Sequence, residues 1–122
     1  MDLHARTPTF MTRMDPRVKK ILELLQQDRS GKGLTSRGLA KRVNLSTSRL
    51  YYLFNAEMKT TPARYAKNER IEAARLLLET TFLSVKEIAA LSGFDDQSHF
   101  TRDFKKRYDL TPARHRARNF KG

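Results

Sequence analysis

One stretch of this 122-residue chain carries hydrogen-bond donors on one side of a helical pattern and aromatic residues on the other. Phe100, Phe104 and Tyr108 recur every four residues, which predicts the buried side of a helix. At about 100° per residue, the opposite side carries Gln97, Ser98, Thr101, Arg102 and Lys105. Arginine, glutamine and hydroxyl side chains can bind the edges of bases, and lysine can pair with phosphate.

The residues before this helix predict another helix and a tight turn. Ser84 and Glu87 are spaced so that each side chain can bond the other's backbone amide, a capping box that starts a helix. Gly93 suits the left-handed conformation that ends it, and Asp95 or Asp96 can cap the helix that follows. A donor-bearing second helix after a glycine turn is typical of a helix-turn-helix unit, whose second helix fits the major groove of DNA.

The chain contains a second copy of this pattern. Residues 34–65 align with residues 83–115 at an offset of 49 before the turn and 50 after it. Both copies match in their helix caps, in their apolar positions and in the exit sequence Thr-Pro-Ala-Arg, at 61–64 and 111–114. Such a repeat predicts two helix-turn-helix units, because an accidental hairpin would not repeat its caps, core and exit together.

The first copy supplies its own donor-bearing helix. Ser46 can cap a helix from Thr47 to about Met58. The outward stripe of this helix is Ser48, Tyr51, Tyr52 and Asn55. Its tyrosines can contact thymine methyl groups or phosphate.

A long helix is predicted between the two copies. Thr61 can cap it with Pro62 at its first position, and its apolar residues continue to about Thr80. At about 1.5 Å per residue it would span roughly 28 Å, which approaches the ~34 Å repeat of one DNA face. A helix of this length could hold two recognition helices near adjacent major-groove segments.

These signals predict an all-α fold of about seven helices, in which two helix-turn-helix subdomains are joined by the long linker helix. The expected boundaries are a flexible leader over 1–14, a first unit over 15–61, the linker over 62–80, a second unit over 83–118 and a basic tail over 119–122. A polar loop is expected over 26–33. The end of the chain, from Arg114 through Arg116 and Arg118 to Lys121, is basic and expected to fray.

The composition indicates a polyanionic partner. Lys and Arg number 25 against 13 Asp and Glu, a net charge of +12, so nucleic acid is the leading candidate. There is no cysteine, the three histidines lack metal-ligand spacing, and no glycine-rich phosphate loop occurs, so we expect no enzyme, cofactor or metal. The chain has no apolar run near 18 residues and no signal peptide, so we expect no membrane partner and a cytoplasmic location.

Three motifs carry a family resemblance. They are Arg70-Ile71-x-x-Ala74-x-x-Leu77-Leu78, Ile88-Ala89-x-x-x-Gly93-Phe94, and Ser98-x-Phe100-x-Arg102-x-Phe104-Lys105-Lys106 followed by Thr111-Pro112. Over residues 16–118, the chain resembles the DNA-binding domain of the AraC/XylS family of bacterial transcription regulators. The resemblance implies binding of double-stranded promoter DNA, activation through RNA polymerase and a nucleoid-associated location in a bacterium. It also implies that any small-molecule effector site lies outside this chain.

The resemblance also implies roles for particular residues. Those expected at base edges are Thr47, Ser48, Tyr51, Tyr52, Gln97, Ser98, Thr101 and Arg102. Those expected to contact the DNA backbone are Arg49, Arg64, His99, Lys105 and Lys106.

The sequence departs from the family pattern in three places. Tyr52 stands where the first recognition helix often carries arginine. Lys59 and Asp109 replace the glycine that usually ends each recognition helix; aspartate tolerates the left-handed conformation, whereas lysine there would cost about 1 kcal/mol unless the turn differs. Gly38 weakens the first short helix by a similar amount. The second unit is therefore predicted to be the better formed.

Two other classes remain as alternatives. A non-specific structural nucleic-acid binder would use the same charge, but its paired donor stripes would then have no purpose. A protein-interaction module that does not read DNA is disfavoured by the strength of the basic charge.

Overall fold

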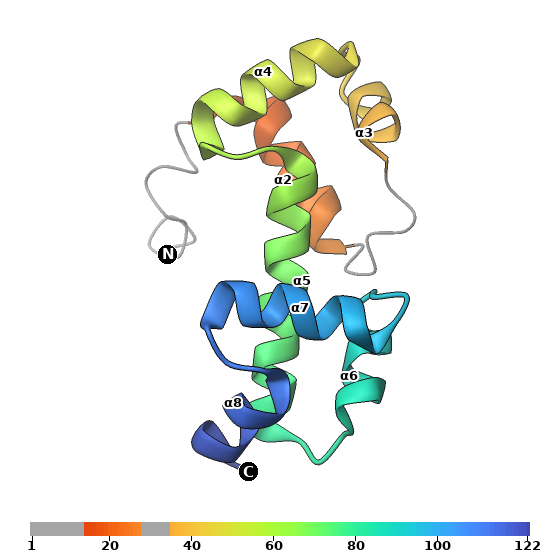
Figure 1. Cartoon of the computed structure of the whole chain (residues 1–122). Helices are drawn as coiled ribbons and strands as arrows, with labels where there is room; N and C mark the ends of the chain where they lie inside the picture. Colours follow the sequence, from red (N-terminus) through yellow and green to blue (C-terminus); the bar gives the residue numbers. More distant parts are fainter. Residues whose placement is uncertain (1–13, 28–34) are drawn as a thin grey trace, which may run out of the picture. The chain divides into compact units, whose positions relative to one another are not determined.

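The computed structural model describes residues 14–27 and 35–122, and within them it contains seven α-helices and no strand (Figure 1). The helices are α2 (Pro16–Gln27), α3 (Ser36–Arg42), α4 (Thr47–Met58), α5 (Pro62–Thr80), α6 (Val85–Leu91), α7 (Gln97–Tyr108) and α8 (Pro112–Asn119). The predicted all-α class with about seven helices is confirmed. Of the predicted leader and polar loop, residues 1–13 and 28–33 lie outside the described residues. Met14 is buried, so it belongs to the core rather than to a leader.

The chain divides into two compact units. Among the described residues, 14–27 and 35–65 form the first unit, and 66–122 form the second. Helix α5 begins in the first unit and continues in the second. None of the helices in the described part is long and apolar enough to span a membrane.

The first unit packs α2 and α3 against α4. The apolar side of α2 is buried, with Val18 and Ile21 each 1% exposed. On α4, Phe54 is 0% exposed and meets Tyr65 of α5 edge-on, with ring centroids 5.9 Å apart. The Ser46 hydroxyl accepts the Arg49 amide hydrogen at 3.1 Å, so the predicted cap of α4 is present.

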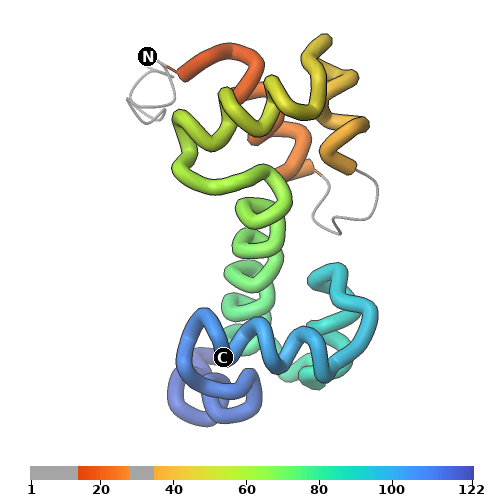
Figure 2. Tube along the Cα trace, turned by 45° about the horizontal axis from the view of Figure 1, so that its top comes forward, coloured from red at the N-terminus to blue at the C-terminus, as the bar shows by residue number. Residues whose placement is uncertain are grey.

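The second unit builds its core from α5, α6 and α7. Its buried members are Ile71, Ala74, Leu78, Ile88, Ala89, Phe94, Phe100 and Phe104. The Ser84–Glu87 capping box is present, and Gly93 adopts the left-handed conformation with φ 85°. Figures 1 and 2 both show α7 crossing the second-unit part of α5. Phe100 and Phe104 are each 0% exposed, so these rings of α7 face inward, as the aromatic spacing predicted.

The end of the chain is held firmly, so the expectation that it frays is wrong. The Arg116 guanidinium donates to the carbonyls of Leu78 at 3.1 Å and Thr81 at 3.2 Å. The Lys121 amide donates to the carbonyl of Glu79 at 2.7 Å. The last carbonyls of a helix lack partners within that helix. The C-terminal segment supplies donors to these groups at the end of α5, and the sequence pattern did not show this.

Both recognition helices end in the left-handed conformation without a glycine. Lys59 has φ 59° and Asp109 has φ 63°, and each amide closes the last turn by donating to the carbonyl four residues earlier. The turn after α4 therefore keeps the left-handed conformation although its residue is Lys59. Lysine there carries the predicted cost of about 1 kcal/mol.

Candidate nucleic-acid interface

Helix α7 presents the predicted donors on its outward side. Phe100 and Phe104 are 0% exposed, which fixes the rotation of the helix, and Asp96 fixes its start by accepting the His99 amide hydrogen at 2.7 Å. The predicted DNA-contacting residues Gln97, Ser98, Arg102, Lys105 and Lys106 are exposed, as are His99 and Arg107. Thr101 is half-buried at the edge of this side. The arrangement can offer hydrogen-bond donors to base edges and positive charge to phosphates.

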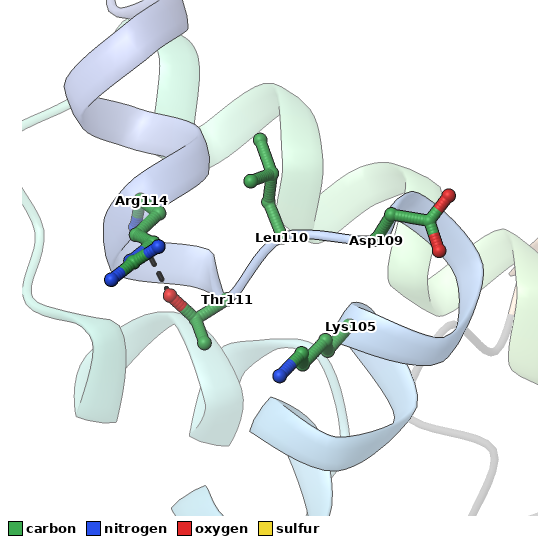
Figure 3. A pocket seen from close by; sticks show the side chains of 5 residues that line it. All are labelled: Lys105, Asp109, Leu110, Thr111 and Arg114. Carbon is green, nitrogen blue, oxygen red and sulfur yellow. Dashed lines mark hydrogen bonds between the residues drawn. The ribbon is translucent and has the colours of Figure 1, made fainter.

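The C-terminal half of α7 borders two basic hollows. One has a volume of about 430 Å³ and is lined by Arg102, Lys105, Lys106 and Asp109. The other, about 320 Å³, is lined by Lys105, Asp109, Leu110, Thr111 and Arg114 (Figure 3). Arg102, Lys105 and Lys106, which were predicted to contact DNA, thus line the first hollow. Lys105 also lines the second hollow, together with Arg114, which was predicted only as part of the basic end of the chain.

His99 lies on the flank of α7, in an ion-pair cluster. Its Nε2 lies 3.1 Å from Oδ2 of Asp103, and the same oxygen lies 2.9 Å from Nζ of Lys67 on α5. The Asp103 carboxylate is buried, whereas the side chains of His99 and Lys67 are each more than 40% exposed. A phosphate contact by His99 would therefore be made by an imidazole that already touches a carboxylate.

Helix α4 presents a different set of side chains. Ser48, Arg49 and Tyr52 are exposed, and Thr47 is half-buried. Tyr52 is 70% exposed, whereas Tyr51 is 37% exposed and its hydroxyl shares a hydrogen bond of 3.1 Å with Ser36 of α3. Tyr51 therefore also links α4 to α3. Arg64, at the start of α5, is exposed.

Glu72 and Glu79 of α5 are bonded to side chains of α5, α7 and α8. Arg75 donates to Glu79 at 2.7 Å and to Glu72, which also accepts the Tyr108 hydroxyl. Arg75 and then Tyr108 lower the pKa of Glu72 to about 2. The pKa of Glu79 is lowered first by its hydrogen bond with His115 of α8, at 2.7 Å, and then by Arg75. Burial, together with the bond to Glu72, raises the pKa of Tyr108. These contacts hold α7 and α8 against α5.

Two features of this candidate surface were not predicted from the sequence. Arg114 lines the hollow together with Lys105. Its counterpart in the first repeat, Arg64, was already expected to contact DNA, so the repeat offset of 50 could have predicted a DNA contact by Arg114. The Lys67–Asp103 pair had no such signal, because its members are far apart in sequence and neither belongs to a motif. Within residues 14–27 and 35–122, no group of three or more His, Cys, Asp or Glu side chains could hold a metal ion.

Comparison with known proteins identifies a helix-turn-helix domain in this chain. A family model described as a helix-turn-helix domain matches residues 39–118. The arabinose operon regulatory protein of Escherichia coli is 33% identical over 104 residues, which cover 85% of this chain and 36% of that protein. The chain therefore spans about a third of the length of this curated relative.

Solved structures agree with this match. The C-terminal domain of AraT, a response regulator from Geobacillus stearothermophilus, superposes with a TM-score of 0.84 at 28% identity, covering 90% of this chain and 91% of that one. The xylose-binding transcription activator xylR superposes with a TM-score of 0.76 at 31% identity, covering 88% of this chain and 28% of that one. The sequence match and the seven-helix architecture together show that this chain belongs to the AraC/XylS family of DNA-binding transcription regulators.

Proposed function

We propose that this chain binds specific sequences in double-stranded promoter DNA by inserting α4 and α7 into adjacent major-groove segments. The observation that carries the proposal is the outward side of α7. It presents Gln97, Ser98 and Arg102 to solvent opposite two fully buried phenylalanines. A helix that buries aromatic rings on one side and exposes bidentate donors on the other is suited to reading base edges.

The proposed base contacts divide between the two helices. Arg102 would bind guanine O6 and N7 and Gln97 would bind adenine, while the hydroxyls of Ser98 and Thr101 bind donors or acceptors. On α4, Thr47, Ser48, Tyr51 and Tyr52 would fill the corresponding role. Backbone contacts are assigned to Arg49, Arg64, His99, Lys105 and Lys106.

We further propose that the working protein activates transcription through contact with RNA polymerase, at the nucleoid in the bacterial cytoplasm. A relative of similar fold is named a xylose-binding transcription activator, and this chain covers 28% of it. Because the match covers only part of that protein, we assign no effector site to this chain.

Selection of bound duplexes from a random pool tests the proposal. We expect an enriched site with two short blocks about one helical turn apart. The affinity for the selected duplex should exceed that for a scrambled duplex at every salt concentration. Equal affinity for all duplexes, with a steep dependence on salt, would instead identify a non-specific structural binder.

A further inference from the structure

Among the residues that line the hollow between the end of α7 and the first turn of α8, Lys105 alone has a role in the function proposed above (Figure 3). This hollow shares Lys105 and Asp109 with the hollow that borders Arg102. It therefore continues the outward surface of α7 onto α8. A strand of DNA whose bases lie against Arg102 would have its backbone close to this surface.

Two cationic side chains line this hollow without an acidic partner. In the part of the chain that the structure describes, no carboxylate oxygen lies within 4.0 Å of the Lys105 ammonium or the Arg114 guanidinium. By contrast, Arg75 and Lys67 of the same unit are both ion-paired. The Asp109 carboxylate belongs to the lining, but it points away from Lys105 and Arg114 in Figure 3.

The backbone around Arg114 is already fixed. The Thr111 hydroxyl accepts the Arg114 amide hydrogen at 3.2 Å, which sets the first turn of α8. Because this amide is already bonded, it is not available to a ligand in the hollow, whereas the side chains of Lys105 and Arg114 are. A guanidinium and an ammonium that line one hollow suit a phosphate group, since arginine can bind two of its oxygens and lysine adds a point charge.

We propose that this hollow binds a phosphate of the DNA backbone through Lys105 and Arg114, and we call this site the phosphate seat. The inference rests on the proposed function, and it extends the DNA contact surface from the recognition helix α7 to α8. The first unit has Asn55 and Lys59 at the positions of Lys105 and Asp109, so this combination of residues occurs only in the second unit.

The salt dependence of DNA binding by the Arg114→Gln variant tests the phosphate seat. Each phosphate contact contributes about 0.9 to the slope of log affinity against log salt concentration. We expect Arg114→Gln to reduce the slope by about one unit and to weaken the selected and scrambled duplexes by the same factor. Lys105→Gln should behave alike, and the double variant should lose more of the slope than either single variant.

A matched control separates the seat from the loss of net charge. Lys86→Gln removes the same charge from α6, where the residue is exposed and, among the described residues, has no carboxylate oxygen within 4.0 Å. We expect it to leave the slope nearly at the parent value. A loss of slope equal to that of Arg114→Gln would assign the effect to overall charge and overturn the seat.

Inorganic phosphate distinguishes a backbone seat from a site for a free anion. We expect NMR signals of Lys105 and Arg114 to shift on adding a duplex and to show no saturable shift with inorganic phosphate. Saturable phosphate binding that Arg114→Gln abolishes would show a free-anion site and overturn the assignment to DNA.

The seat and the proposed function can fail separately. If the parent protein selects a sequence and Arg114→Gln keeps the parent slope, the seat is wrong and the proposed function stands. If the parent selects no sequence, the proposed function is wrong, and the slope on any duplex still decides whether Arg114 binds phosphate.

Discussion

The two helix-turn-helix units share one ring contact at equivalent positions. In the first unit Phe54 meets Tyr65 with centroids 5.9 Å apart and planes at 75°. In the second unit Phe104 meets His115 at 5.4 Å and 76°, and both residues are offset by 50 from their counterparts. The geometry of the repeat is thus kept although one ring has changed type. Because the second ring is an imidazole, it can also bond the buried carboxylate of Glu79.

The units differ in how their helices are held and in what they expose. The second unit fastens α7 and α8 to α5 through Glu72, Arg75 and Glu79, whereas the first unit links α3 to α4 through the hydroxyls of Ser36 and Tyr51. At one equivalent outward position, α4 carries Tyr52 and α7 carries Arg102. One scaffold can therefore present an aromatic face in one unit and a cationic face in the other, because outward residues contribute little to packing.

The largest expected effect comes from removing the buried rings. Phe54→Ala and Phe104→Ala each delete a side chain that is 0% exposed, and each should lower the free energy of unfolding by about 3 to 5 kcal/mol. Phe104 also packs on Phe100 and Tyr108, so we expect its loss to lie at the upper end. Urea unfolding followed by NMR signals from α4 and α7 measures each unit. A larger loss for Phe54→Ala would reverse the predicted ranking of the two cores.

Acid should weaken the second unit before the first. The folded-state pKa of Glu72 is about 2, below its ordinary value of 4.5, and that of Glu79 is also lowered. A lowered folded pKa gives stability that is complete above the unfolded pKa and is lost as the carboxylate is protonated. Signals from α7 and α8 should therefore lose urea resistance as the pH falls from about 5 toward about 2.

Glu79→Gln provides the control for this pH dependence. The variant should be less stable at pH 7, because an amide replaces a charged partner of Arg75 and His115. It should also show a flatter loss of stability on acidification. An unchanged pH profile would mean that Glu79 does not cause the acid sensitivity.

Base preference should differ between the units. We expect Arg102→Ala to cost about 1 to 3 kcal/mol on the selected duplex and to relax the preference at one position of one block. Tyr52→Ala should cost less and affect the other block, because tyrosine lacks the bidentate donors of arginine. Binding to duplexes that vary one base at a time measures both. If Arg102→Ala retained every base preference of the parent, its assignment to base reading would be wrong.

The smallest expected effect is at the ends of the recognition helices. Lys59 and Asp109 both have positive φ, a conformation that glycine adopts without strain. Lys59→Gly should stabilise the first unit by up to about 1 kcal/mol, and Asp109→Gly should gain less because aspartate tolerates this conformation. Thermal unfolding of the two variants gives the comparison, and an equal gain at both sites would remove this difference between the units.

The local signals of the sequence were enough for the helices and for the sides that they expose. The caps at Ser46, Ser84 and Asp96 and the left-handed Gly93 all lie where the pattern predicted them. Each depends on residues within one turn of a helix, so spacing alone specifies them. The all-α fold follows from the same signals together with the internal repeat, whereas the family was indicated by the resemblance of three motifs.

Only the tertiary structure decided how the chain end and the charged residues are used. Arg116 and Lys121 were expected in a frayed tail, yet they satisfy carbonyls at the end of α5. Arg114 joins Lys105 at one hollow, and Asp103 joins Lys67. These partners come from different helices, and a long cationic side chain can reach many groups. Sequence spacing therefore determined which side of each helix is buried, whereas the packing of one helix on another determined which charges meet.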